Sequence, residues 1–164
     1  MNLSTEQCQY LIDLCESKGG WKRIRFSPNT SYRTVPVDLS GADDIKDLIT
    51  EYCKQYLNLN VISVNLGVIK YLPGDAFDRH RDDGGHKFSE DFMYNINVIL
   101  NNDYEGGEFF LNDVPHVRPM GEIYHYKSNE YHGVTEITKG VRYSALFYIR
   151  YRDIKKETNL TKLI

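Results

Sequence analysis

Residues 61–72 read VISVNLGVIKYL, and this stretch begins a run of segments with the same character. Val, Ile, Tyr and Phe dominate the run, while Gly, Asn and Asp interrupt it, which is typical of short strands joined by turns. The further strands that we expect lie at residues 92–101, 107–112, 122–127 and 141–152. Between two of them, the sequence NNDYEGG predicts a hairpin connection, because its glycines can adopt positive φ.

Two helices are expected before these strands. Ser4 followed by Gln7 forms a capping-box pattern, and Gly19-Gly20 ends the first helix. The second helix is expected from Asp43 to about Leu57, where apolar residues recur on one face.

Helices followed by many short strands favour a mainly β (α+β) fold. We expect a single domain over residues 1–164, with a jelly-roll (double-stranded β-helix) core at 61–151. Residues 1–60 would give helical support packed on one sheet, and residues 152–164 a tail.

Composition narrows the class of protein further. The 164 residues carry a formal net charge of −3, which argues against a dedicated nucleic-acid-binding module. No apolar run approaches the roughly 20 residues of a membrane span, and the N-terminus lacks the basic start of a signal peptide. Cys8, Cys15 and Cys53 have neither disulfide nor zinc-site spacing, so we expect buried free thiols and a cytoplasmic location.

The sequence His80-Arg81-Asp82 is the first candidate metal-binding element. Residues i and i+2 of an extended strand point to the same side, so the imidazole and the carboxylate can reach one ion. His132 follows after enough strand and turn for the chain to return to the same place. Two histidines and one carboxylate are the facial donor set of non-haem iron(II) enzymes, which leaves coordination positions open.

Arg142 is the candidate binding residue for an anionic ligand. It lies ten residues after His132, on the next expected strand at residues 141–152, and an arginine that points into a barrel needs a carboxylate partner. Its planar fork suits a bidentate contact, and Ser144, on the same strand face, can add a hydroxyl. Asn95 and Asn97 alternate on another strand as possible polar lining of that pocket, and Asn97 is the candidate contact.

Three other residues compete for the metal. His125 lies only seven residues before His132, and we expect it on a strand face or pocket wall. His86 lies in a glycine-rich loop, and Asp83 points away from Asp82 in an extended chain. Tyr94, Tyr124 and Tyr131 are either core residues or lining of a substrate groove, and the sequence does not separate these uses.

Four ordered blocks resemble the prolyl-4-hydroxylase-like branch of the 2-oxoglutarate/iron(II) dioxygenases. They are YLPGDAFDRHRD, YEGGEF, PMG and HGVTEITKGVRYSALF, within residues 61–151. The resemblance implies that iron(II) is bound by His80, Asp82 and His132 and that Arg142 binds the C5 carboxylate of 2-oxoglutarate. It also matches Tyr71 to a tyrosine that hydrogen-bonds 2-oxoglutarate in some relatives.

The resemblance implies a dioxygenase that uses O2 and releases succinate and CO2. We expect the substrate to be a residue within a peptide or protein, with proline first, and the loop at residues 83–91 to cover it. A free amino acid or small metabolite is the alternative, and nucleic acid comes third. A non-enzymatic jelly-roll metal-binding protein and a cupin-like enzyme without 2-oxoglutarate are the rivals. A surface-exposed Arg142 would favour the cupin-like enzyme.

Overall fold

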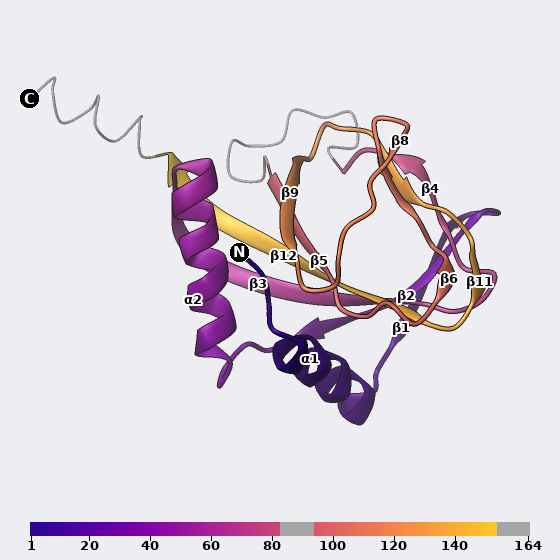
Figure 1. The fold of residues 1–164 in the computed structure, drawn as a ribbon, viewed down its shortest axis with the longest axis horizontal. Coiled ribbons are helices and arrows are strands. Elements are labelled where there is room, and N and C mark those ends of the chain that lie inside the picture. The colour runs from indigo at the N-terminus through magenta and orange to yellow at the C-terminus, as the bar shows by residue number, and fades with distance from the viewer. Residues whose placement is uncertain (83–93, 154–164) are drawn as a thin grey trace, which may run out of the picture.

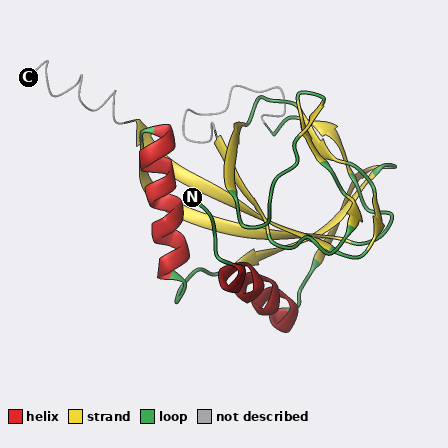
Figure 2. Cartoon of the chain, viewed as in Figure 1, coloured by secondary structure: helices red, strands yellow, loops and turns green. Residues whose placement is uncertain are grey.

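The structure of the protein, a computed structural model, describes residues 1–82 and 94–153 (Figure 1). The expected loop at residues 83–91, with Asp83 and His86, and the tail beyond residue 153 lie outside the described residues. Figure 2 shows many strands and few helices in the described chain, as the sequence predicts. No helix in residues 1–82 or 94–153 is long and apolar enough to cross a membrane.

The helical segments come first in the chain. They are α1 (Thr5–Lys18), α2 (Asp43–Tyr52) and the π-helical turn η1 (Cys53–Leu57). The strands are β1 (Lys22–Ser27), β2 (Thr30–Val37), β3 (Leu59–Tyr71), β4 (Phe77–His80), β5 (Tyr94–Ile99), β6 (Glu105–Gly106), β7 (Phe109–Leu111), β8 (Val114–Pro115), β9 (Ile123–Lys127), β10 (His132–Val134), β11 (Ile137–Lys139) and β12 (Arg142–Asp153).

Both helices begin and end near the positions that the sequence predicts. In α1, the Ser4 hydroxyl accepts a hydrogen bond from the Gln7 backbone and the Ser4 backbone donates one to the Gln7 side-chain oxygen, so the predicted capping box is present. The helix ends at Gly19, where φ is +64°. The second helix also runs to Leu57, but its last five residues form a π-helical turn that ends at Asn58 in the left-handed region.

Two sheets form the body of the fold. The large sheet has the strand order β1-β2-β3-β12-β5-β9, and the small sheet has the order β4-β10-β7-β8. The large sheet's inner pairs are antiparallel, and β12 runs along the whole of β3, from Arg142 opposite Tyr71 to Asp153 opposite Leu59. Figure 1 shows both helices on the same side of the large sheet, away from β4 and β8.

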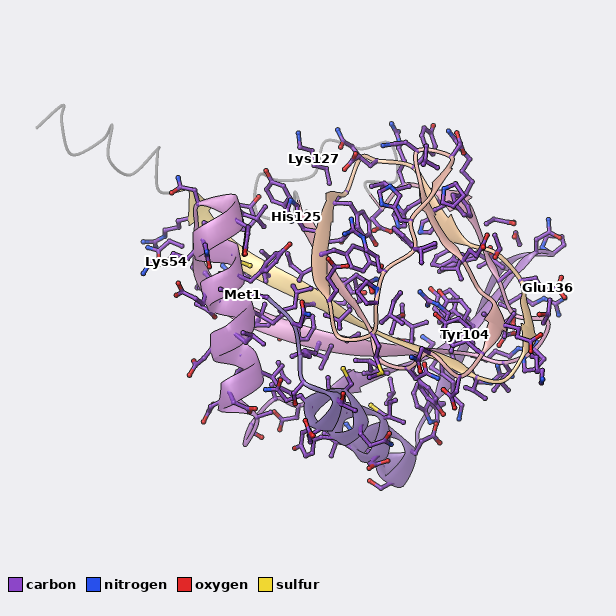
Figure 3. The ribbon with its side chains drawn as sticks, viewed as in Figure 1. Met1, Lys54, Tyr104, His125, Lys127 and Glu136 are labelled. Atoms are coloured by element: carbon purple, nitrogen blue, oxygen red, sulfur yellow. The ribbon has the colours of Figure 1, made fainter. Side chains whose placement is uncertain are left out.

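Strand β12 divides the interior between these two sides. Ala145, Phe147 and Ile149 pack with apolar residues of both helices in the main core. The alternate residues, among them Arg142 and Ser144, face the small sheet. Side chains of the two sheets crowd the space between them (Figure 3). The predicted jelly-roll core with helices on one sheet is confirmed.

Two details of the expected fold are wrong. The segment NNDYEGG is not a hairpin, because β5 before it belongs to the large sheet and β7 after it to the small sheet. Residues 1–60 are not wholly helical, because β1 and β2 form a hairpin there that extends the large sheet beyond β3. Lys22, Arg23 and Arg25 give β1 a charged pattern, which is typical of an edge strand and hides its apolar face from sequence reading.

Candidate metal centre

The two candidate histidines lie side by side on neighbouring strands of the small sheet. His80 is the last residue of β4 and His132 the first of β10, and the two are paired across the antiparallel strands. Their ring centroids are 4.2 Å apart. This strand pairing brings His80 and His132 together although they lie 52 positions apart in the chain.

Asp82 completes the group just beyond the end of β4. One carboxylate oxygen, Oδ1, lies 3.3 Å from His80 Nε2, and the other, Oδ2, lies 3.3 Å from His132 Nε2. One donor atom from each of the three side chains falls within 4.8 Å of the others. His132 is buried, whereas the Asp82 side chain keeps 35% of its exposure, so the group is accessible from one side.

The outer nitrogens of both histidines already have partners. His80 Nδ1 lies 2.7 Å from the carbonyl oxygen of Asp78, and His132 Nδ1 lies 3.0 Å from that of Glu130. A carbonyl oxygen only accepts, so each Nδ1 carries a proton and each Nε2 is turned toward Asp82. Three acceptor atoms can stay this close only with a proton or a metal cation between them. This donor set fits iron(II).

The Asp82 carboxylate is held ionised and in place by its surroundings. Burial raises its pKa, but hydrogen bonds from His132 and His80 lower it by more, so the pKa lies well below the usual range. The amide of the buried Asn95 donates to Asp82 Oδ2 at 2.5 Å. Asn95 therefore orients the carboxylate from behind.

Replacing Asn95 by alanine should weaken iron(II) binding by about 10-fold to 100-fold, the usual effect of removing a partner that orients a metal ligand. Anaerobic titration with iron(II) against a competing chelator measures this directly. The matched control is Asn60→Ala, because Asn60 is an exposed residue of β3. Equal affinities of the Asn95 variant and the unaltered protein would show that Asp82 needs no such support.

Arg142 lies on the opposite sheet from the histidines. The sequence suggested that it follows His132 on the next strand, but β11 comes between, and β12 belongs to the large sheet. Arg142 is only 1% exposed, and its Nη1 donates to the Ser144 hydroxyl at 3.3 Å. Its Nε has no hydrogen-bond partner among the described residues. A buried guanidinium with an unsatisfied donor and no carboxylate partner fits an anionic ligand.

One narrow pocket connects this arginine to the metal-binding group. Its lining includes His80, Asp82, His132, Tyr71, Asn97, Ser144 and Arg142. The structure thus brings together every residue that the sequence suggested for the site. Asn97 has an unpartnered side-chain oxygen there. Tyr71 is buried, and the Arg142 guanidinium carbon lies 5.3 Å from its ring centroid.

A larger groove of about 650 Å³ opens beside His80 and Asp82. The β1–β2 hairpin forms one wall with Phe26 and Tyr32, and Tyr148 of β12 also lines the groove. Phe26 is 73% exposed although it packs on Phe77, whose ring stacks on His80 at 3.8 Å between centroids. The hairpin that sequence reasoning missed is therefore a wall of the entrance to the metal centre.

The rival residues lie elsewhere. His125 is on β9, on the side of that strand toward α2 (Figure 3), where its Nδ1 hydrogen-bonds the Tyr52 hydroxyl at 2.9 Å. Tyr94 packs toward the helices, next to the main core. Tyr131 is partly exposed at the surface, with the Arg79 guanidinium carbon 3.6 Å from its ring centroid.

A two-residue turn contacts residues beside both candidate histidines, and the sequence did not predict it. Asn112 and Asp113 join β7 to β8 with positive φ, as in a type I′ turn. Asp113 accepts two hydrogen bonds from Arg79, the neighbour of His80, at 2.7 and 3.1 Å. Asn112 donates to the Glu130 side chain at 3.0 Å, next to the carbonyl that holds His132. The Asn-Asp dipeptide between short apolar segments was the available signal.

Fold and site together define a class of protein. A jelly roll that presents two histidines and one carboxylate, with open positions on one side, is the arrangement of non-haem iron(II) oxygenases. A model of the 2OG-Fe(II) oxygenase superfamily matches residues 66–150, which is more than half of the chain. The chain therefore belongs to the 2OG-Fe(II) oxygenase superfamily.

Individual relatives are distant. A PKHD-type hydroxylase of Cupriavidus metallidurans is 24% identical over 131 residues, which cover 70% of this chain and 58% of the relative. Thus the chain spans little more than half the length of that curated protein. A Pseudomonas putida prolyl-4-hydroxylase has a similar fold, with a TM-score of 0.71 and 20% identity over 92% of this chain and 89% of its own.

A viral collagen prolyl hydroxylase from Paramecium Bursaria Chlorella virus-1, solved with 2OG, gives a TM-score of 0.70. It is 18% identical, over 90% of this chain and 91% of its own. Identities this low show a shared fold only. The family match confirms the predicted family, whose name gives Fe(II) and 2-oxoglutarate as what its members use. The residues assigned to each cofactor stay predictions.

Proposed function

We propose that the chain is an Fe(II)- and 2-oxoglutarate-dependent dioxygenase that hydroxylates a residue within a peptide, with proline first, and releases succinate and CO2. The observation that carries this proposal is the single pocket shared by His80, Asp82, His132 and the buried Arg142. Bound iron(II) and 2-oxoglutarate supply the oxidising chemistry.

The residues of the chain then have separate tasks in this proposal. His80, Asp82 and His132 bind the metal from one side and leave its other side open to the groove. Arg142, with Ser144, holds the distal carboxylate of 2-oxoglutarate at the buried end of the pocket. Tyr71 and Asn97 line the same pocket between Arg142 and the metal ligands. Burial of this end excludes water from the ion pair, which strengthens it.

The groove supports an internal peptide residue more than a free amino acid. A free amino acid carries an ammonium group that needs an available carboxylate. In the described lining only Asp78 is left for that role, because Asp82 faces the histidines, and Asp78 already accepts a hydrogen bond from the Ser27 hydroxyl at 2.6 Å. Aromatic and aliphatic side chains make up most of the rest of the wall. A small metabolite stays the second candidate because a volume of 650 Å³ is typical of small-molecule sites.

The experiment for the class of reaction is an anaerobic mixture of the protein, iron(II) and 2-oxoglutarate, in which we expect the weak visible charge-transfer band of the chelate. Admission of air with a substrate should then yield succinate. A protein that gives neither band nor succinate is not a 2-oxoglutarate dioxygenase.

For the substrate, panels of peptides and of free amino acids are screened for a mass gain of one oxygen. Phe26→Ala should raise the KM for a peptide substrate about 10-fold while leaving 2-oxoglutarate affinity unchanged, because an exposed aromatic ring contributes about 1–2 kcal/mol when a ligand covers it. The exposed Tyr10, on α1, provides the control variant Tyr10→Ala. Oxidation of free amino acids alone would favour the metabolite reading.

The partners and the location follow from this proposal. We propose a peptide or protein substrate and no nucleic-acid partner. The three buried free cysteines support a reducing compartment such as the cytoplasm.

A further inference from the structure

The buried end of the pocket carries more unsatisfied polar groups than Arg142 alone. Among the described residues, four buried side-chain atoms have no hydrogen-bond partner. One of them, Trp21 Nε1, packs against the helix-side core. The other three are Arg142 Nε, the Asn97 oxygen and the Tyr124 hydroxyl, all from residues on the face of the large sheet that carries the site.

Tyr124 reaches this region from β9, the strand at the far edge of the large sheet. It is paired across the strands with Asn97, and its ring packs 5.5 Å from that of Phe109, centroid to centroid. Both Asn97 and Phe109 line the narrow pocket. Tyr124 is only 5% exposed and its hydroxyl is buried, so solvent does not replace the missing protein partner.

Among charged side chains, Arg142 has the strongest influence on the pKa of the Tyr124 hydroxyl. Burial raises the pKa of Tyr124, and the positive charge of Arg142 is the largest influence that lowers it, ahead of Arg118. Arg142 and Tyr124 also act on the pKa of Tyr71, which burial raises. Tyr71 lines the pocket beside Arg142, and Tyr124 lies next to this lining, directly opposite Asn97 on the neighbouring strand.

A buried phenol without a partner is costly to keep, because phenylalanine would fill the same space without a polar atom to desolvate. A ligand that accepts its hydrogen bond removes this cost. A carboxylate can do so, because its two oxygens accept about four hydrogen bonds and the Arg142 fork uses only part of them.

We propose that the Tyr124 hydroxyl donates a hydrogen bond to the distal carboxylate of 2-oxoglutarate, alongside Arg142. This inference rests on the proposed function and adds a binding residue to it. It assigns a role to one of the tyrosines whose use the sequence left open.

The test is the variant Tyr124→Phe, which removes one oxygen atom and leaves the ring. Thermal unfolding is followed with Mn(II) in place of iron, so that binding is measured without turnover, and the shift in Tm gives the ligand affinity. Two ligands are compared: 2-oxoglutarate, and 2-oxopentanoate, which has a methyl group where 2-oxoglutarate has the distal carboxylate. We expect the variant to bind 2-oxoglutarate about 10-fold to 100-fold more weakly and 2-oxopentanoate as the unaltered protein does.

The matched control is Tyr52→Phe. That hydroxyl is also buried but bonds His125 on the helix side, so its loss should lower the Tm without ligand and leave the preference for 2-oxoglutarate intact. Tyr124→Phe should not lower the Tm without ligand. An unchanged preference for 2-oxoglutarate in Tyr124→Phe would overturn the inference alone. A protein whose Tm responds to neither ligand would overturn the proposed function as well.

Discussion

Replacing Asp82 by alanine should abolish both iron(II) binding and 2-oxoglutarate-dependent succinate formation. The two histidines alone leave a neutral site, and the only carboxylate within reach of both Nε2 atoms among the described residues is that of Asp82. Loss of one of three ligands, and of the only negative charge, removes most of the affinity for a divalent ion. Anaerobic iron(II) titration and quantification of succinate measure the two effects.

Asp44→Ala is the control for this variant, because Asp44 is an exposed aspartate of α2 whose oxygen accepts a hydrogen bond from Gln7. It should bind iron(II) and form succinate as the unaltered protein does. Substituting His80 or His132 by alanine should resemble Asp82→Ala. An Asp82→Ala protein that remains folded and keeps its iron(II) affinity would mean that the metal is bound elsewhere.

Sequence reasoning predicted the fold class, and it chose site residues that the structure brings together in one pocket. The pair His80 and Asp82 could be found because a spacing of two places both side chains on one side of an extended chain. The strand at residues 141–152 could be found because its apolar run is long and uninterrupted. Both patterns involve only residues that are close in the sequence, so a single sequence is enough to recognise them.

The failures concern pairings between distant segments. The sequence NNDYEGG has the glycines of a hairpin, yet it connects two sheets, because which strands pair is decided by tertiary packing. The β1–β2 hairpin was missed for another reason: arginine and lysine alternate with Ile24 and Phe26, and a charged edge strand resembles a loop. The role of the Tyr124 hydroxyl also could not be predicted, since only the structure shows that this hydroxyl lacks a hydrogen-bond partner.

Replacing Arg142 by alanine should weaken 2-oxoglutarate binding by about 100-fold to 1,000-fold, the loss that corresponds to about 3–4 kcal/mol for one member of a buried ion pair. Arg142 is the largest of the fully buried side chains, and no described carboxylate pairs with it. Among the described residues nothing balances its charge, so we expect a ligand to do so. The Tm shift with 2-oxoglutarate and Mn(II) measures the loss, and the charge-transfer band of the iron chelate should fade in parallel.

Two further variants separate charge from geometry and from folding. Arg142→Lys keeps the charge but not the planar fork, so we expect an intermediate affinity. Arg150→Ala, an exposed arginine on the same strand, should bind 2-oxoglutarate normally. Because truncation of a buried residue can also disturb the pocket, Arg142→Ala is assayed with 2-oxopentanoate too, which should bind as before. If Arg142→Ala retained its preference for 2-oxoglutarate over 2-oxopentanoate, the distal carboxylate would have to lie elsewhere.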